Sequence, residues 1–160
     1  MFKILSIFIF SFFIFSGIAL SQSENNYEPV KEFNPERNPA NDVTEAVKEA
    51  KRTNKRIILD VGGDWCIWCH RLDAFIDKDG EIKDFISKNF IMVKINFSRE
   101  NKNEEFLSKY PEIPGYPHFF VLEKNGEFLH SQNTGELEEN KGYSKEKMMS
   151  FLKEWAPENQ

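Results

Sequence analysis

The feature that most constrains the fold of this chain is a pair of cysteines placed just after a short apolar run. Cys66 and Cys69 are the only cysteines among 160 residues. They follow Ile57–Val61, a run that is too short for a helix and rich in branched side chains, which predicts a buried strand. Gly62 and Gly63 interrupt this run, so the next helix should begin near the cysteines. The chain must therefore contain a strand-to-helix junction with both sulfurs beside it.

The rest of the chain predicts alternating helices and strands. We expect helices at 43–53, 65–76 with a further turn at 82–86, 101–110 and 144–155, and strands at 57–61, 91–96, 118–123 and 127–131. Asn125-Gly126 is typical of a tight hairpin between the last two strands. The early strands alternate with helices, which favours parallel pairing. The sequence therefore predicts an α/β fold, with one mixed sheet of about four to five strands and helices on both faces.

The first 21 residues differ from all others. Lys3 is their only charged residue, residues 4–20 are almost wholly apolar, and Ala19-Leu20-Ser21 offers small side chains before a polar stretch. A basic start, an apolar centre and a small-residue end are typical of a secretory signal peptide, which we place at 1–21. An uncleaved anchor is the alternative, because 17 apolar residues lie at the lower limit of a membrane span.

Residues 22–41 are polar and contain three prolines, which predicts a linker or a loosely attached arm. Asp42 is expected to be the N-cap of the first helix, so the domain is predicted at 42–160. Without residues 1–21 the chain has 26 acidic and 20 basic residues, interspersed as on a soluble surface. This pattern offers no basic stripe for nucleic acid. Export would place the domain in an oxidising compartment, the periplasm or the cell exterior.

Two cysteines three positions apart at the start of a helix are suited to thiol–disulfide exchange. A thiol at the helix N-terminus faces unpaired backbone N–H groups and the positive end of the helix dipole, which stabilise the thiolate. We therefore assign Cys66 as the nucleophile and Cys69, one turn inside, as the thiol that resolves the mixed disulfide. A purely structural disulfide fits less well, because a four-residue loop contributes only about 2 kcal/mol against about 4.7 for a hundred-residue loop.

From about residue 42 to 156 the chain resembles the thioredoxin superfamily, and within it the exported thioredoxin-like proteins with a W-C-x-W-C-[HK] active site. The similarity comprises the lead-in 45–60, Asp60 six residues before the first cysteine, Trp65 directly before it, Pro117 at the position of the family's cis-proline, and the hairpin Lys124-Asn125-Gly126-Glu127. Features in register over about 115 residues are far more specific than C-x-x-C alone.

The resemblance implies a thioredoxin-like fold and a thiol–disulfide oxidoreductase with a redox-active Cys66–Cys69 disulfide. It implies that Asp60 is a buried carboxylate with a raised pKa that relays a proton for Cys69. Pro117 would present the backbone of Tyr116 to a substrate strand, which adds through main-chain hydrogen bonds.

Trp65 and Trp68 are expected to form an exposed apolar collar around Cys66 and to bind substrate together with Tyr116 and Pro117. The dipeptide Ile67-Trp68 differs from the Gly-Pro of cytoplasmic thioredoxin, so the direction of electron flow is not implied. The partners implied are cysteine-containing envelope proteins and, for a reductase, a membrane thiol carrier as electron donor, because NADPH is not exported. No cofactor is implied.

Three other hypotheses use the same residues. C-x-x-C-H is also the attachment signature of a c-type haem with His70 as axial ligand, although cytochrome c domains are helical. A metal site of Cys66, Cys69, His70 and His118 would lack a second close ligand pair, so we predict none. A non-catalytic module could hold unfolded chains on its tryptophan-rich rim. We expect His70 to be an exposed helical residue and His118 a surface or half-buried strand residue.

Overall fold

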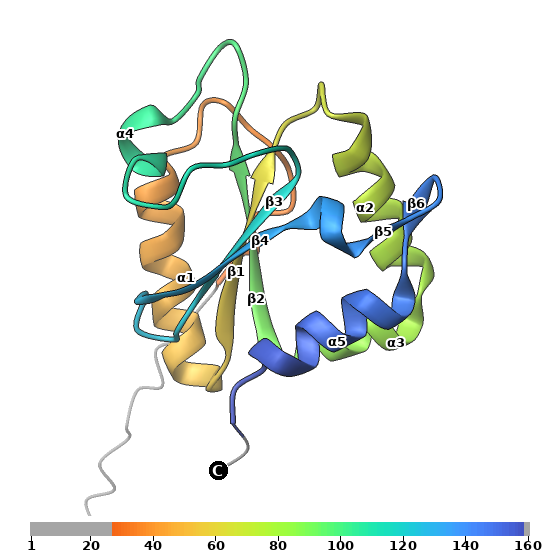
Figure 1. Cartoon of the computed structure of the whole chain (residues 1–160). Helices are drawn as coiled ribbons and strands as arrows, with labels where there is room; N and C mark the ends of the chain where they lie inside the picture. Colours follow the sequence, from red (N-terminus) through yellow and green to blue (C-terminus); the bar gives the residue numbers. More distant parts are fainter. Residues whose placement is uncertain (1–26, 159–160) are drawn as a thin grey trace, which may run out of the picture.

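A mixed β-sheet organises residues 27–158, the part of the chain that this computed structural model describes. Its strands are β1 (Arg56–Gly62), β2 (Phe90–Asn96), β3 (His118–Leu122) and β4 (Phe128–Asn133). They lie in the order β2-β1-β3-β4 (Figure 1). β1 pairs parallel to β2 and antiparallel to β3, and β3 pairs antiparallel to β4. The predicted α/β class and mixed sheet are confirmed.

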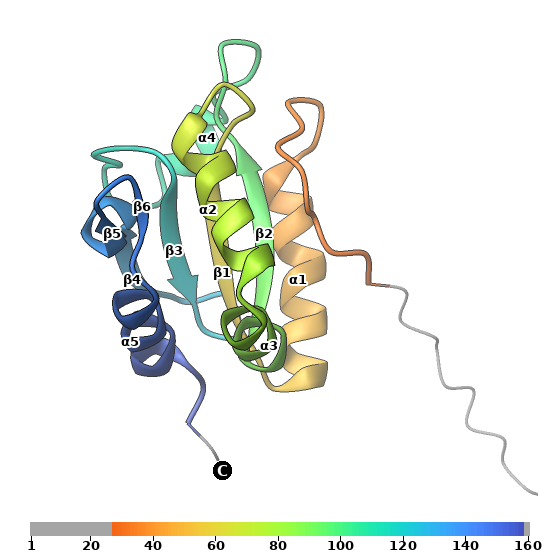
Figure 2. The same ribbon diagram turned by 90° about the vertical axis from the view of Figure 1, so that its right-hand side faces the viewer.

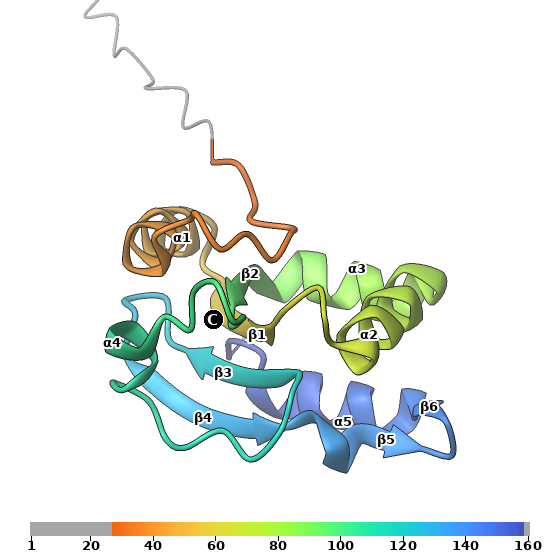
Figure 3. The ribbon, with the colours of Figure 1, turned by 90° about the horizontal axis from the view of Figure 1, so that it is seen from above.

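Helices cover both faces of this sheet. α1 (Pro39–Thr53) and the short α4 (Glu104–Leu107) lie on one face, and α2 (Ile67–Lys78), α3 (Gly80–Asn89) and α5 (Lys145–Trp155) lie on the other (Figures 1 and 3). None of the helices within residues 27–158 has the length and apolar character needed to cross a membrane. The predicted signal peptide at 1–21 lies outside the described residues.

Side-chain alternation along β1 determines what faces each layer. Ile57, Leu59 and Val61 pack into the cluster on the α1 face, whereas Ile58 packs into the cluster on the α2 face. Because β1 is central and covered on both faces, nearly all of it is buried. Asp60 has the same parity as Ile58, so this carboxylate points to the layer that contains α2.

The first helix begins earlier than predicted. Asn38, not Asp42, is its N-cap, with a side chain that accepts hydrogen bonds from the backbone N–H groups of Ala40 and Asn41. Pro39 occupies the first turn, where its missing N–H costs nothing. Asp42 lies inside the helix and pairs with Arg37 instead. The predicted domain boundary at residue 42 therefore falls within α1.

The described part of the predicted arm is packed against the domain and is not loosely attached. Val30 and Phe33 are buried, and the Val30 carbonyl accepts a hydrogen bond from the backbone N–H of Lys94 on β2 at 3.1 Å. We call residues 27–37 the strap; it passes β2 before the chain enters α1 (Figures 2 and 3). The strap is polar in sequence because a few apolar side chains anchor it and the rest face solvent.

Two further segments differ from the predictions. The predicted helix at 101–110 shrinks to α4, because Asn103 has a left-handed φ of 50° and its side chain donates to the carbonyl of Asn96 in a loop. After β4, a 3₁₀ turn at Thr134–Leu137 leads into a hairpin of β5 (Glu138–Glu139) and β6 (Gly142–Tyr143), which was not predicted. This hairpin packs beside α2 (Figure 1). Strands of two residues have no period to detect.

Candidate active site

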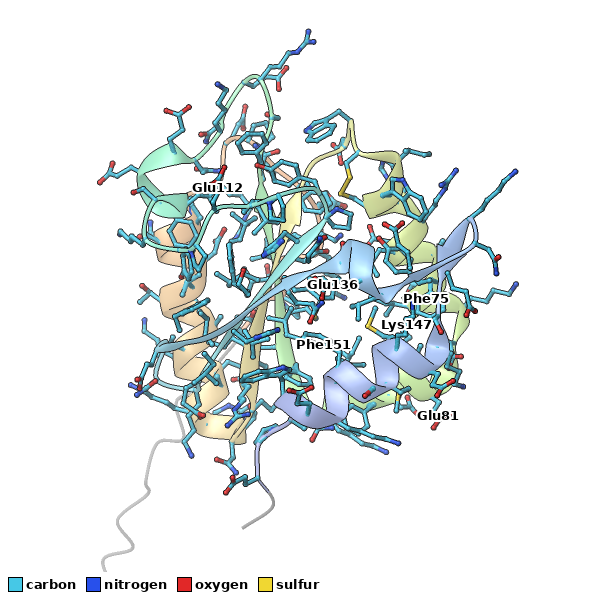
Figure 4. All side chains as sticks on the ribbon, viewed as in Figure 1. Phe75, Glu81, Glu112, Glu136, Lys147 and Phe151 are labelled. Atoms are coloured by element: carbon cyan, nitrogen blue, oxygen red, sulfur yellow. A yellow bond between two sulfur atoms is a disulfide. The ribbon has the colours of Figure 1, made fainter. Side chains whose placement is uncertain are left out.

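The predicted strand-to-helix junction carries the cysteine pair. β1 ends at Gly62, and α2 begins at Ile67 with Cys66 as its N-cap. The Cys66 Sγ accepts a hydrogen bond from the backbone N–H of Cys69 at 3.1 Å. A disulfide joins the two cysteines, and their Cα atoms are 5.3 Å apart. Figure 4 shows it as a yellow bond beside the first turn of α2. A sulfur thus occupies the place that a capping oxygen usually fills.

Both cysteines are buried. Cys66 is 4% exposed and Cys69 is 1% exposed, so the second cysteine is only slightly more buried than the first. Trp65 and Ile67, the neighbours of Cys66, are 58% and 61% exposed. The Trp65 indole donates a hydrogen bond to the carbonyl of Phe97 at 2.6 Å, which fixes the ring at the rim of the site. The expectation of an exposed indole is correct for Trp65.

That expectation is wrong for Trp68. Its ring is partly buried, with its centroid 5.9 Å from that of Tyr143 in an edge-on contact, and the guanidinium of Arg71 lies 4.5 Å from the Trp68 centroid. The Tyr143 hydroxyl also donates to the Trp68 carbonyl at 3.4 Å. Phe75, labelled in Figure 4, contacts the same tyrosine ring at 5.8 Å. Trp68 turns inward because the β5–β6 hairpin offers it an aromatic partner.

The turn before β3, which contains Tyr116 and Pro117, packs against the two cysteines. The Tyr116–Pro117 peptide bond is cis, as the resemblance implies. The Tyr116 ring packs against the cluster that contains both cysteines, stacks on Phe97 with centroids 4.7 Å apart, and meets the edge of Trp65 at 5.7 Å. The structure therefore brings an aromatic rim and the proline turn to the sulfurs.

Asp60 is buried on the face of β1 that meets the disulfide. It is 2% exposed, and Gly62, two residues further along the same face of β1, contacts the second sulfur: a Cβ on Gly62 would lie 2.5 Å from the Cys69 Sγ. Burial raises the pKa of Asp60 from 3.8 to about 6, although the ammonium group of Lys94 opposes this rise and Asp73 adds to it. Within the described residues, the Asp60 Oδ1 has no hydrogen-bond partner.

Lys94 and Asp73 complete the charge cluster, and neither was predicted from the sequence. The register of β1 and β2 places Lys94 opposite Asp60, and its Nζ lies 3.2 Å from the Asp60 carboxylate and 2.7 Å from that of Asp73. Burial of Lys94 disfavours its charged form, but the two carboxylates outweigh burial and raise its pKa. A lone lysine within the apolar run 91–95 was the available signal, because a buried cation requires a partner.

The two histidines have different positions. His70 is exposed, as expected, with its Nε2 2.8 Å from the Asp64 carbonyl. His118 is fully buried, which contradicts the expected surface or half-buried position. Its Nε2 lies 2.8 Å from the Ser131 hydroxyl and its ring packs on Phe120, on the α1 side of the sheet. Burial, with a smaller contribution from a neighbouring histidine, lowers the pKa of His118 to about 4.

The ligand set of the metal hypothesis is not assembled. The sulfurs of Cys66 and Cys69 are bonded to each other, and the rings of His70 and His118 lie in separate environments. Across residues 27–158, no cluster of three or more His, Cys, Asp or Glu side chains is arranged to hold a metal ion. The haem hypothesis needs the same two sulfurs and a free His70, whose ring here contacts a backbone carbonyl.

Comparisons with known proteins agree with this geometry. The disulfide bond reductase DsbH of Chlamydia pneumoniae is 30% identical over 94 residues, which cover 53% of this chain and 56% of DsbH. The thiol:disulfide interchange protein DsbD of Actinobacillus pleuropneumoniae is 23% identical over 87 residues, 54% of this chain and 15% of DsbD. The chain thus spans about half the length of DsbH and a smaller part of DsbD.

Solved structures show the same fold. A disulphide isomerase from Xylella fastidiosa superposes with a TM-score of 0.66 at 25% identity, covering 76% of this chain and 94% of the isomerase. The oxidised C-terminal domain of DsbD from Neisseria meningitidis gives a TM-score of 0.55 at 20% identity, over 74% and 96% of the two chains. The sequence profile of the thioredoxin-like family matches residues 38–124, more than half of the chain. This chain therefore belongs to the thioredoxin-like family.

Proposed function

We propose that this protein is a thiol–disulfide oxidoreductase of the W-C-x-W-C-[HK] kind, in which Cys66 is the nucleophile and Cys69 the resolving thiol. The observation that carries this proposal is the position of Cys66 as the N-cap of α2, where its sulfur already accepts a backbone N–H group. Backbone donors and the helix dipole stabilise a thiolate at this position more than a thiol. The names of the similar proteins, a disulfide bond reductase and a disulphide isomerase, support the same chemistry.

In the reducing direction, the Cys66 thiolate attacks one sulfur of a substrate disulfide. A bond forms between Cys66 and that sulfur, and the other substrate sulfur leaves as a thiolate that takes up a proton. Cys69 then transfers its proton to Asp60 and attacks the Cys66 sulfur, which releases the second substrate thiolate. The protein dithiol loses two electrons and the substrate disulfide gains two. In the oxidising direction the same bonds form and break in reverse order.

Asp60 suits the role of proton acceptor in this sequence. Its carboxylate is buried on the face of β1 that meets the Cys69 sulfur, and its Oδ1 has no hydrogen-bond partner among residues 27–158. A carboxyl group with a pKa near 6 is a stronger base than an exposed aspartate and is still mostly ionised at neutral pH.

We also propose where the protein works and what it meets. The signal-peptide pattern at 1–21 supports export, so the substrates would be cysteine-containing envelope proteins, and a membrane thiol carrier would supply electrons to a reductase. Trp65, Tyr116 and Pro117 would contact the substrate at the rim of the disulfide, with Trp68 supporting them from its partly buried position.

The test compares the two cysteines. In an assay of insulin or glutathione disulfide reduction, Cys66→Ser should lose turnover, and Cys69→Ser should accumulate a mixed disulfide at Cys66 that mass spectrometry detects. Turnover retained in Cys66→Ser would refute the catalytic assignment and favour a binding module. Equilibration of the parent with glutathione gives the direction, since a potential near −270 mV indicates a reductant and one near −120 mV an oxidant.

A further inference from the structure

Among the described residues that precede α1, 27–38, Phe33 is the one that lies in the disulfide site. It is 5% exposed and forms a separate apolar cluster with Cys66 and Cys69. A Cβ on Gly62 would lie 2.5 Å from the Cys69 Sγ and 3.0 Å from the Phe33 Cζ. The resolving sulfur and the edge of the phenyl ring therefore share the space above Gly62, where only a glycine leaves room for both.

The same ring also covers the charge cluster. The Lys94 Nζ lies 4.1 Å from the centroid of Phe33, a cation–π distance. This ammonium group is the one that pairs with Asp60 and Asp73. A single side chain thus contacts both the sulfur that must lose a proton and the cation beside the carboxylate that would accept it. Burial raises the pKa of the Asp60 carboxyl. A side chain that keeps water away from Asp60 and Lys94 therefore also keeps this pKa raised.

Hydrogen bonds fix the strap both before and after Phe33 in the sequence. Before Phe33, the Val30 carbonyl is bonded to the backbone of Lys94 at 3.1 Å. After it, the Asn101 side chain donates to the Pro35 carbonyl at 2.8 Å. The strap precedes the residues that match the family profile, 38–124.

We infer that Phe33 is a positioning residue of the dithiol site, whose ring keeps bulk water away from Cys69, Lys94 and Asp60 during resolution. The Cys69 thiol then gives its proton to the Asp60 Oδ1, while the electron pair stays on sulfur and forms the bond to Cys66. This inference rests on the proposed function. Phe33 packs against the two cysteines but has no titrating group, so it acts on the proton transfer through Asp60.

The experiment compares Phe33→Ala with Phe33→Leu, which keeps an apolar cover, and with Phe128→Ala, which removes a half-exposed phenylalanine from β4. The first readout is the titration of the Asp60 carboxyl, followed by ¹³C NMR in the oxidised protein. The second is the pH profile of resolution, measured by the release of glutathione from a mixed disulfide after rapid mixing of reduced protein with glutathione disulfide. Asn101→Ala, which removes the anchor at Pro35, loosens the strap by a second route.

We expect Phe33→Ala to move the Asp60 titration and the acid limb of the profile downward, toward the pKa of an exposed aspartate, and to slow resolution at pH 7 by about three- to tenfold because the base is weaker. Phe33→Leu keeps an apolar cover but loses the ring contact with Lys94, so it should shift both much less than Phe33→Ala. Phe128→Ala should leave both unchanged, and Asn101→Ala should shift both in the same direction as Phe33→Ala but less. In an Asp60→Asn background, Phe33→Ala should add nothing to the pH profile.

Two results would overturn the inference while the proposed function stands. One is an Asp60 titration that is identical in the parent, Phe33→Ala and Asn101→Ala. The other is an equal slowing by Phe33→Ala with and without the Asp60 carboxylate, which would make Phe33 a purely structural residue. A parent protein that never exchanges with glutathione would instead refute the proposed function. The NMR titration would still decide whether Phe33 keeps water away from Asp60 and Lys94.

Discussion

The two sides of the disulfide differ in almost every physical respect. The outer side is an aromatic rim, with Trp65 and Ile67 largely exposed and Tyr116 at its edge. The inner side is buried and charged, with Asp60 paired to Lys94 and the Lys94 ammonium group beneath the Phe33 ring. The difference separates two tasks. Under the proposed function, the outer side would decide which disulfide reaches Cys66, and the inner side would decide how the proton of Cys69 is moved. Substitutions on the two sides should therefore change different measurable quantities.

The largest effect should come from the inner side. Asp60→Asn should increase the free energy of unfolding at pH 7 by as much as about 3 kcal/mol, because the folded protein holds the carboxyl proton with a pKa of about 6 against 3.8 when unfolded. The buried carboxylate costs stability above pH 6, and this cost disappears as the pH falls below 4. Urea unfolding at pH 7 and pH 3.5 measures it.

Asp73→Asn is the control for this prediction, because its carboxylate is partly exposed and should give a smaller change. Turnover of Asp60→Asn should fall although the protein is more stable. An equal stability difference at both pH values would show that burial does not penalise the Asp60 carboxylate, and the contrast between the two sides would lose its electrostatic basis.

A second inner-side effect is steric. Gly62→Ala should lower the free energy of unfolding of the oxidised protein by about 2 kcal/mol, because its Cβ would overlap the Cys69 sulfur and press on the Phe33 ring. Gly80→Ala on α3, where a Cβ meets no atom within 4 Å, should be neutral or slightly stabilising. Equal thermal unfolding of the Gly62→Ala variant and the parent would mean that the inner side has spare room.

On the outer side, Trp65→Ala should raise KM for a peptide disulfide about tenfold and leave kcat and the pH profile unchanged. The exposed indole offers contact area to a substrate but no titrating group. Phe128→Ala, which also removes a large exposed side chain, should leave KM unchanged. Steady-state kinetics across pH 5–9 checks this. A shifted pH profile in Trp65→Ala would mean that the two sides are not separate.

The smallest effect should come from the β5–β6 hairpin, which packs beside α2. Tyr143→Phe removes the long hydrogen bond to the Trp68 carbonyl and should lower the free energy of unfolding by about 0.5–1 kcal/mol, with kcat and KM unchanged. Thermal unfolding and the same kinetic assay measure both quantities. A kinetic defect with intact stability would place the β5–β6 hairpin in the chemistry of the site rather than in its support.

Features that depend on residues close together in the sequence could be predicted, and features that depend on contacts between distant residues could not. The junction of β1 and α2 depends on local patterns, namely an apolar run, two glycines and a helix start, so the positions of Cys66 and Cys69 were predictable. The pairing of Asp60 with Lys94 depends on the register of two strands separated by two helices, which no local pattern specifies. Asp60 was found through resemblance and Lys94 was not.

Phe33 and Trp68 show the same limit. Phe33 stands in a polar stretch with proline and asparagine neighbours, so its composition predicted an arm, and only the packing of the strap on β2 reveals a site residue. Trp68 was expected beside Trp65 at the rim, but its orientation depends on Tyr143, which lies 75 residues further along the chain. Contacts of this kind require the tertiary structure.

The strap has a second consequence, for how molecules of this protein behave toward one another. β2 is at one edge of the sheet, and its sequence, FIMVKIN, is mostly apolar, which makes it a template for pairing with the strands of other molecules. The hydrogen bond between Val30 and Lys94 occupies one position of this edge, whereas β4 at the other edge carries histidine, serine, glutamine and asparagine. The strap that we infer shields the dithiol therefore also covers part of this edge, and we expect its removal to lower solubility as well as redox activity.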